Sequence, residues 1–234
     1  MLIGRKEDMT IKVKILPETT KDPISLIGRR AGCCTHACVD DPDKNFRRGM
    51  DCLKSNHGRV LEFVQVDMEI SGVSSRVIRE WYTHIGGLPT RLQESTRYVN
   101  YGCNIPFVLP ESIASDPDVF EYTRQFGKQY AKFISFLKTK NIPLEDIAMF
   151  YPLGTETKIV DHRNLRNVID MLHQRMCRRA YWEYREICDI IRRKLCDYSE
   201  EWAIIVEGYL VPKCEYLGRC PESNSCGWIN KQED

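Results

Sequence analysis

Apolar and polar residues alternate along short stretches of the chain. Residues 10–16 (TIKVKIL) alternate up to Pro17, and residues 62–70 (EFVQVDMEI) alternate again. A period of two residues is typical of a strand with one buried face. The pattern predicts strands over 10–16 and 62–70, and a further strand over 157–161.

Other stretches carry apolar residues at helical spacing. The predicted helices cover 45–55, 74–83, 116–139, 144–150 and 164–197. The helix over 116–139 carries an aromatic stripe (Tyr122, Phe126, Tyr130, Phe133 and Phe136), which we expect to lie in the core. Within 164–197, Arg178 and Arg179 mark a kink, and the last thirty residues show no periodicity. Residues 29–32 are expected to form a turn, and Gly86, Gly87 and Pro89 to break the chain.

The order of these elements favours an α+β (α/β-like) fold. The strands over 10–16 and 62–70 are expected to pair as an antiparallel sheet flanked by helices. No internal repeat or low-complexity linker interrupts the chain. We therefore expect one main domain over 1–210, followed by a cysteine-containing C-terminal tail over 211–234.

The composition excludes several classes of protein. The chain has 234 residues, 42% hydrophobic and 29% charged, with a formal net charge of +1. A charge so close to zero gives no field for nucleic acid or for an anionic membrane, so an anionic ligand has to be bound by local arginines. No stretch approaches the ~18 apolar residues of a membrane span. Residues 1–10 are charged and lead into no apolar segment, and together with eleven cysteines this predicts a cytoplasmic protein with free thiols.

Three segments, in order along the chain, resemble the flavin-dependent thymidylate synthase family. The first, 57–62 (HGRVLE), resembles His-x-Ser/Thr-x-x-Glu before a strand, with Arg59 in place of the small hydroxyl residue. The second, 79–98 (REWYTHIGGLPTRLQESTRY), resembles Arg-His-Arg-x-x-Ser-x-Asn-Glu-x-Ser-x-Arg with a loop two residues longer. The end of this segment matches the end of the motif, whereas Thr83 and Ile85 replace the arginines on either side of the motif's histidine. The third, 164–185, matches Asn-x-Arg, an arginine nine residues later, and Ala-x-Trp-Glu.

The resemblance implies the fold of that family, a homotetramer with sites shared between subunits, and FAD-dependent methylation of dUMP to dTMP. Methylene-tetrahydrofolate supplies the one-carbon unit and NADPH re-reduces the flavin in this family. Carried over by motif, the dUMP-binding residues are Gln93, Glu94, Ser95, Arg97 and Arg175, with Arg175 also catalytic. The FAD-binding residues are His57, His84, Asn164 and Arg166.

The residue types suit these roles. Arginine binds a phosphate through two parallel hydrogen bonds, which lysine does not, and a fixed cation stabilises charge that develops on a uracil carbonyl. His57 and His84 are each either a flavin contact or a structural histidine. Arg166 and Arg175 are nine residues apart and so lie on opposite sides of a straight helix. That separation indicates that they serve different ligands or different sites.

The cysteines leave a second hypothesis open. Cys214, Cys220 and Cys226 are spaced C-x5-C-x5-C among glycine and proline turns, as in a zinc or iron–sulfur site, with an N-terminal cysteine as a further ligand. Buried structural cysteines are the alternative. Two other functions also remain: an enzyme of the same fold with a changed pyrimidine product, and a non-catalytic metal-binding relative.

Overall fold

The computed structural model describes residues 11–101 and 105–229, so Thr10 of the first predicted strand lies outside the described residues. The chain forms two compact units. Unit 1 consists of Met1–Lys12, Ile70–Thr83 and Leu92–Ile159, and unit 2 consists of Val13–Glu69, His84–Arg91 and Val160–Asp234. Each unit is described by itself below.

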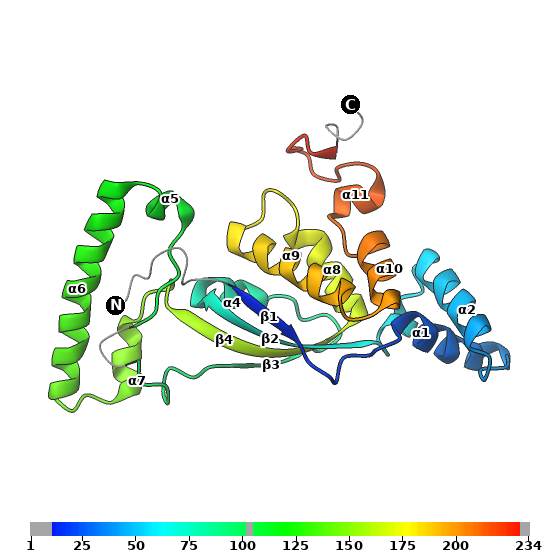
Figure 1. Ribbon diagram of the computed structural model, residues 1–234, viewed down its shortest axis with the longest axis horizontal. Helices are drawn as coiled ribbons and strands as arrows, with labels where there is room; N and C mark the ends of the chain where they lie inside the picture. The colour runs from blue at the N-terminus through cyan, green and yellow to red at the C-terminus, as the bar shows by residue number, and fades with distance from the viewer. Residues whose placement is uncertain (1–10, 102–104, 230–234) are drawn as a thin grey trace. The chain divides into compact units, whose positions relative to one another are not determined.

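Four strands form one sheet in the order β1-β2-β4-β3 (Figure 1). The strands are β1 (Lys12–Ile15), β2 (Gln65–Ser74), β3 (Thr90–Gln93) and β4 (Glu156–Asn164). The Leu16 amide donates to the Asp67 carbonyl at 2.8 Å and the Thr20 amide to the Gln65 carbonyl at 3.0 Å, so the chain runs antiparallel there. The predicted pairing of the first two strands is confirmed. The short strand β3 was not predicted.

Helices make up most of unit 2 (Figure 1). They are α1 (Pro23–Gly32), η2 (Cys33–Thr35), α2 (Pro42–Lys54), α3 (Gly58–Leu61), α8 (Leu165–Arg175), α9 (Trp182–Cys196), α10 (Glu200–Gly208) and α11 (Lys213–Leu217). The turn predicted at 29–32 is wrong, because these residues form the last turn of α1. Asp41 accepts a hydrogen bond from the Lys44 amide and Pro42 opens the helix, so α2 begins before the predicted 45.

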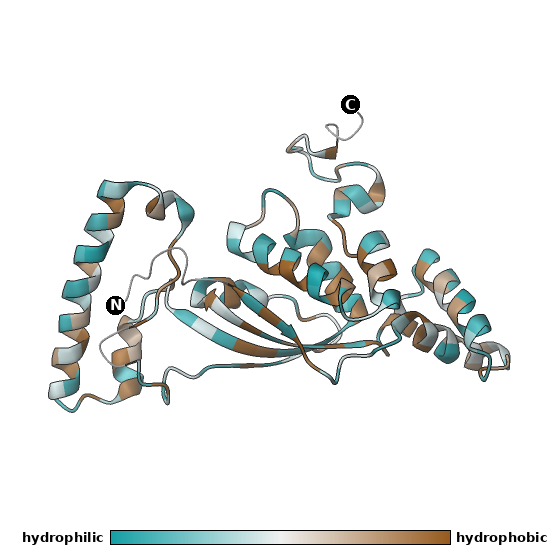
Figure 2. Ribbon diagram, in the orientation of Figure 1, coloured by the Kyte–Doolittle hydropathy of each residue, from teal (hydrophilic) through white to brown (hydrophobic). Residues whose placement is uncertain are grey.

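The single long helix predicted over 164–197 is also wrong. Two helices, α8 and α9, occupy it, and Tyr181 between them has an extended backbone with φ −57° and ψ 134°. Each helix buries its own apolar face, with Val168 and Leu172 inward on α8 and Ile187 and Ile191 inward on α9. Figure 2 shows these apolar stripes in brown. The break changes the helix direction while both stripes stay buried.

Unit 1 contains the long helix predicted over 116–139. Its helices are α4 (Ser75–Trp81), α5 (Glu111–Ala114), α6 (Pro117–Thr139), α7 (Leu144–Ile147) and η3 (Ala148–Phe150). Ile105, Ile134 and Ile147 form a buried cluster between α6, α7 and the chain before α5. Asp116 caps α6 through hydrogen bonds from the Asp118 and Val119 amides.

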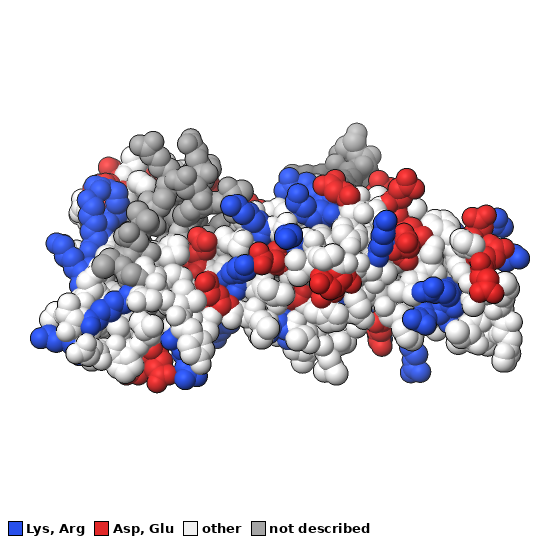
Figure 3. Space-filling view, turned by 60° about the horizontal axis from the view of Figure 1, so that its bottom comes forward, with Lys and Arg blue, Asp and Glu red and all other residues white. Residues whose placement is uncertain are grey.

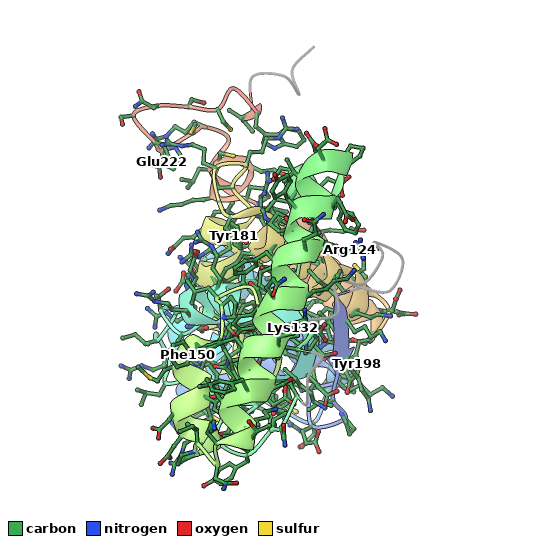
Figure 4. The ribbon with its side chains drawn as sticks, turned by 90° about the vertical axis from the view of Figure 1, so that its left-hand side faces the viewer. Arg124, Lys132, Phe150, Tyr181, Tyr198 and Glu222 are labelled. Carbon is green, nitrogen blue, oxygen red and sulfur yellow. The ribbon has the colours of Figure 1, made fainter. Side chains whose placement is uncertain are left out.

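The aromatic stripe of α6 does not lie in the core as predicted. Tyr122 is 78% exposed, Phe126 61% and Phe136 56%, whereas Gly127 and Ile134 are the buried residues of this helix. Arg124 and Lys132 lie along the same helix (Figure 4). The stripe was assigned to the core because helical spacing shows that a face is apolar but not what covers it.

Charges of both signs share the face of the molecule that Figure 3 draws. On the face in Figure 3, lysines and arginines are interspersed with aspartates and glutamates, and no large patch has a single sign. Within the described residues, no helix is both long enough and apolar enough to cross a membrane.

Candidate functional site

The glycine break after α4 forms a loop that two asparagines hold on the start of α8. Asn164 caps α8 by accepting from the Asn167 amide at 2.9 Å, and its Nδ2 donates to the Gly87 carbonyl at 3.4 Å. Asn167 Nδ2 donates to the Gly86 carbonyl at 2.6 Å. Gly87 has φ +73°, and a Cβ there would lie 2.2 Å from the Asn164 amide nitrogen. The position therefore requires glycine, and Asn164 supports the loop that contains His84.

A buried ion pair orients Asn167. Arg163 Nη1 donates to Asn167 Oδ1 at 2.6 Å, and Arg163 contacts both carboxylate oxygens of Asp161 at 2.5 and 2.8 Å. The side chains of Arg163 and Asp161 are 0% exposed. Sequence reasoning did not find these three residues. The signal was there in β4, because Asp161 and Arg163 occupy the alternate positions whose side chains point inward.

His84 and Arg175 contact each other directly. Arg175 Nε donates to His84 Nε2 at 2.9 Å, and its guanidinium carbon lies 4.9 Å from the centroid of the Tyr184 ring. Burial, together with the smaller effect of the charges of Arg175, Arg163 and Arg91, lowers the pKa of His84 to about 4. His84 is therefore neutral near pH 7, with Nε2 as the acceptor and its proton on Nδ1. It fixes the direction of the Arg175 guanidinium.

Arg166 faces a different partner. Its Nη1 lies 2.8 Å from Glu62 Oε1 in a half-exposed ion pair, and a Cβ on Gly58 would lie 3.2 Å from its guanidinium carbon. His57, the residue before Gly58, is exposed at the start of α3. The structure thus brings Arg166 to the 57–62 segment and Arg175 to His84. The two arginines have different surroundings, which agrees with the nine-residue spacing, but that spacing did not predict these partners.

The predicted dUMP residues other than Arg175 form one stretch of unit 1. The Glu94 amide donates to the Lys158 carbonyl at 2.9 Å, which continues the pairing of β3 with β4. Gln93 Nε2 donates to Thr157 Oγ1 at 3.3 Å.

The rest of this stretch forms a turn, in which the Tyr98 amide donates to the Ser95 carbonyl at 3.1 Å. The Arg97 amide donates to Ser95 Oγ at 3.3 Å, and the Arg97 side chain forms an exposed ion pair with Glu145 at 3.0 Å. Gln93, Glu94, Ser95 and Arg97 are therefore sequence neighbours within unit 1 whose side chains have separate partners, while Arg175 belongs to unit 2.

The predicted metal ligands are not assembled. Within residues 11–101 and 105–229, no three His, Cys, Asp or Glu side chains converge as a set that could hold a metal ion. Cys214, Cys220 and Cys226 are free thiols that line a common cavity without converging on one point.

The fold is shared with solved structures of known proteins. The chain shares its fold with thymidylate synthase X from Helicobacter pylori, solved with FAD and dUMP, at a TM-score of 0.62 and 16% identity over 85% of this chain and 100% of that one. It shares it also with a UMP/dUMP methylase from Streptomyces cacaoi bound to 5-Br dUMP, at a TM-score of 0.70 and 14% identity over 86% and 97% of the two chains.

The sequence itself identifies the family. The model of the thymidylate synthase complementing protein family matches residues 16–198. A flavin-dependent thymidylate synthase of Geobacter sulfurreducens is 31% identical over 188 residues, which cover 76% of this chain and 78% of the relative. The chain belongs to the thymidylate synthase complementing protein family, and the predicted resemblance is confirmed.

Proposed function

We propose that this protein methylates dUMP to dTMP with FAD as cofactor, and with methylene-tetrahydrofolate and NADPH as co-substrates. The main observation behind the proposal is a hydrogen-bonded network at the two ends of α8. It contains His84, Asn164 and Arg175, which occupy the family's motif positions. Family membership supports it, since the Geobacter sulfurreducens relative is named a flavin-dependent thymidylate synthase and the Helicobacter pylori enzyme was solved with FAD and dUMP.

FAD is assigned to His57, His84, Asn164 and Arg166. These residues suit the cofactor, because a neutral imidazole and an amide match the uncharged heteroatoms of a flavin and a guanidinium matches its pyrophosphate. The Arg166–Glu62 pair is half-exposed, so its loss costs at most about 1 kcal/mol and Arg166 can exchange it for a ligand. Bound FAD supplies the redox step by carrying hydride from NADPH.

dUMP is assigned to Gln93, Glu94, Ser95, Arg97 and Arg175. Arg97 is 62% exposed in its pair with Glu145, so its guanidinium can turn to a phosphate at small cost. Arg175 is assigned the catalytic role, which is to stabilise negative charge that develops on the uracil carbonyl oxygens. His84 supports that role by fixing the guanidinium.

The test compares the flavin spectrum and the rate of flavin oxidation between wild type, site variants and matched control variants. The protein purified without added cofactor should show a two-banded flavin spectrum that bleaches with NADPH, and dUMP should change the rate of flavin oxidation. Arg97→Ala and Arg175→Ala should abolish the dUMP effect. The controls are Arg124→Ala, which breaks a comparable surface ion pair with Glu121, and Arg47→Ala, an exposed position on α2. Both should behave as wild type, and normal turnover in Arg97→Ala and Arg175→Ala refutes the assigned roles.

A homotetramer is part of the proposal. The exposed aromatic stripe of α6 supports it, because an apolar surface of this kind marks an interface more often than a free face. Light scattering of the purified protein tests the state directly. A Tyr122→Glu and Phe126→Glu double variant should lower the mass if α6 lies in an interface. The cytoplasmic location and the separate tail over 211–234 remain predictions.

One observation favours a second function, a changed pyrimidine product or substrate. Thr83 and Ile85 stand where the family signature has arginines, and Ile85 is 65% exposed on a loop that is two residues longer. The Streptomyces cacaoi enzyme of the same fold is named as acting on UMP as well as dUMP. The product mass from each nucleotide distinguishes the two functions.

A further inference from the structure

A cavity of about 1140 Å³ lies between the α8–α9 connection (176–181) and the C-terminal segment 212–228. The Arg178 guanidinium carbon lies 3.6 Å from the centroid of the Trp228 ring, and Arg179 Nη1 donates to the Asn224 carbonyl at 2.9 Å. The C-terminal segment lies beyond residues 16–198, which match the family model. One wall of the cavity is therefore a feature of this chain that the family's motifs do not describe.

Cationic side chains outnumber acidic side chains around this cavity. Among the described residues, seven arginines and lysines line it against four aspartates and glutamates. The formal net charge of the whole chain is only +1. The excess of positive charge is therefore local, and a local field of this sign attracts an anionic ligand.

Most of the arginines in the cavity have no acidic partner. Elsewhere in the chain, Arg97, Arg124 and Arg166 each form an ion pair with a glutamate. Within residues 11–101 and 105–229, five arginines of the cavity form no ion pair, and their side-chain hydrogen bonds go to backbone carbonyls. These five are Arg178, Arg179, Arg185, Arg192 and Arg193.

Two of these arginines are held in place by α9. Arg185 and Arg192 are seven residues apart, which is about two helical turns, so both lie on the face of α9 that lines the cavity. Arg185 Nη1 donates to the Arg178 carbonyl at 3.1 Å. The Nε atoms of Arg185 and Arg192 and the indole nitrogen of Trp228 are buried and have no hydrogen-bond partner among the described residues. Buried donors are rarely left without an acceptor, so these three suit a ligand that supplies one.

We propose that this cavity binds the phosphate groups of NADPH, and the inference rests on the proposed function, which requires this reductant. A guanidinium binds a phosphate through two parallel charge-assisted hydrogen bonds. NADPH carries a pyrophosphate and also a 2′-phosphate with about two negative charges. Its phosphates therefore suit several arginines spread over one cavity, whereas the single phosphate of dUMP would leave most of them without a partner.

The cavity begins beside the residue that is assigned to catalysis. Arg175 lines the cavity and also donates through Nε to His84 at 2.9 Å. The volume is at the upper end of ligand cavities, which are commonly about 300–1,000 Å³, so the space is larger than a single phosphate needs. A dinucleotide can place its phosphates here and extend its nicotinamide toward the residues assigned to FAD.

Binding of 2′-phospho-ADP-ribose tests the inference without any flavin chemistry. This probe carries the phosphates of NADPH and lacks the nicotinamide, so its binding does not depend on the reaction. Calorimetric titration should show binding to the full-length protein, and the double variant Arg185→Gln and Arg192→Gln should weaken it at least about tenfold. The control, Arg29→Gln with Arg47→Gln, removes the same two charges from exposed positions outside the cavity and should bind as wild type. No binding by wild type, or equal affinity in the Arg185 and Arg192 double variant, overturns the inference.

The rate of flavin reduction distinguishes a failure of this inference from a failure of the proposed function. The double variant Arg185→Gln and Arg192→Gln should raise the KM for NADPH at least about tenfold and leave the KM for dUMP unchanged. If wild type binds the probe in the cavity but NADPH does not bleach its flavin, the proposed function fails and the phosphate site stands. If the double variant raises only the KM for methylene-tetrahydrofolate, the cavity holds the carboxylates of the folate and the inference is overturned.

A further measurement uses wild-type protein alone and does not depend on how the variants fold. Arg179 is exposed in the α8–α9 connection, so trypsin can cleave after it. Saturating 2′-phospho-ADP-ribose should slow this cleavage at least several-fold, because a guanidinium bound to phosphate cannot enter the protease. Cleavage after Arg47, an exposed residue on α2, serves as the internal control and should not change. Equal cleavage after Arg179 with and without the probe contradicts the inference.

Discussion

The buried pair of Asp161 and Arg163 gives the sharpest test of how the α8 site is supported. Both side chains are 0% exposed, and two hydrogen bonds of 2.5 and 2.8 Å join them. Arg163 also donates to Asn167, which holds the Gly86 carbonyl at 2.6 Å. Loss of the Asp161 carboxylate should therefore weaken the core and also loosen the loop that contains His84.

The magnitude follows from the cost of breaking a buried ion pair. Removal of one partner of such a pair costs about 3–5 kcal/mol, because the remaining charge keeps its desolvation penalty. Asp161→Ala should lose that amount from a total stability on the order of 5–15 kcal/mol. Asp161→Ala combined with Arg163→Met removes both charges, so the double variant should lose less than the sum of the two single variants by about 0.5–3 kcal/mol.

Urea unfolding followed by circular dichroism measures all four corners of this cycle. Val160→Thr is the matched control, because Val160 is the neighbouring β4 residue and is 40% exposed; its stability should change by no more than about 0.5 kcal/mol. If Asp161→Ala costs less than about 1 kcal/mol, or if the two single changes simply add, then the pair does not support the site as argued.

Three further predictions concern unit 2. Gly28→Ala should unfold the protein or cost more than about 2 kcal/mol of stability, because the new Cβ would lie 1.7 Å from a carbonyl oxygen of α2. The control is Gly208→Ala, whose Cβ would have nothing within 4 Å and which should be neutral or slightly stabilising. A thermal melt of both variants measures the difference. Glu201→Ala should cost about 1–2 kcal/mol in urea unfolding, because the Glu201 carboxylate accepts from two amides at the start of α1 at 2.6 and 3.0 Å; an unchanged midpoint would show that water replaces it. Because the folded-state pKa of His84 is lowered from 6.5 to about 4, the unfolded chain binds the extra proton between these values, so stability should rise with pH across that window. His84→Gln, which keeps an acceptor for Arg175, should flatten the rise, and an identical slope in wild type and variant would contradict the assigned cause.

The sequence by itself determined the family, three of the four strands of the described sheet and the separate directions of two arginines, whereas helices such as α1 and α10 were not predicted. Alternation identified β1, β2 and β4, because a half-buried strand has to alternate. The nine residues between Arg166 and Arg175 placed them on opposite sides of a helix by geometry alone. The Gly86–Gly87 break was visible because the loop requires a left-handed residue at Gly87.

Only the tertiary structure decided what covers each apolar face and what fills each buried position. The stripe on α6 has the composition of a core helix, yet it is exposed, because periodicity does not say which surface a face meets. The helix predicted over 164–197 is two helices, since local propensity cannot show where two buried stripes need different directions. From the sequence alone, Asp161 and Arg163 look like ordinary charged residues of a strand. They stabilise the site because Arg163 forms hydrogen bonds to Asp161 and to Asn167 in the protein interior. Only the tertiary structure shows these contacts.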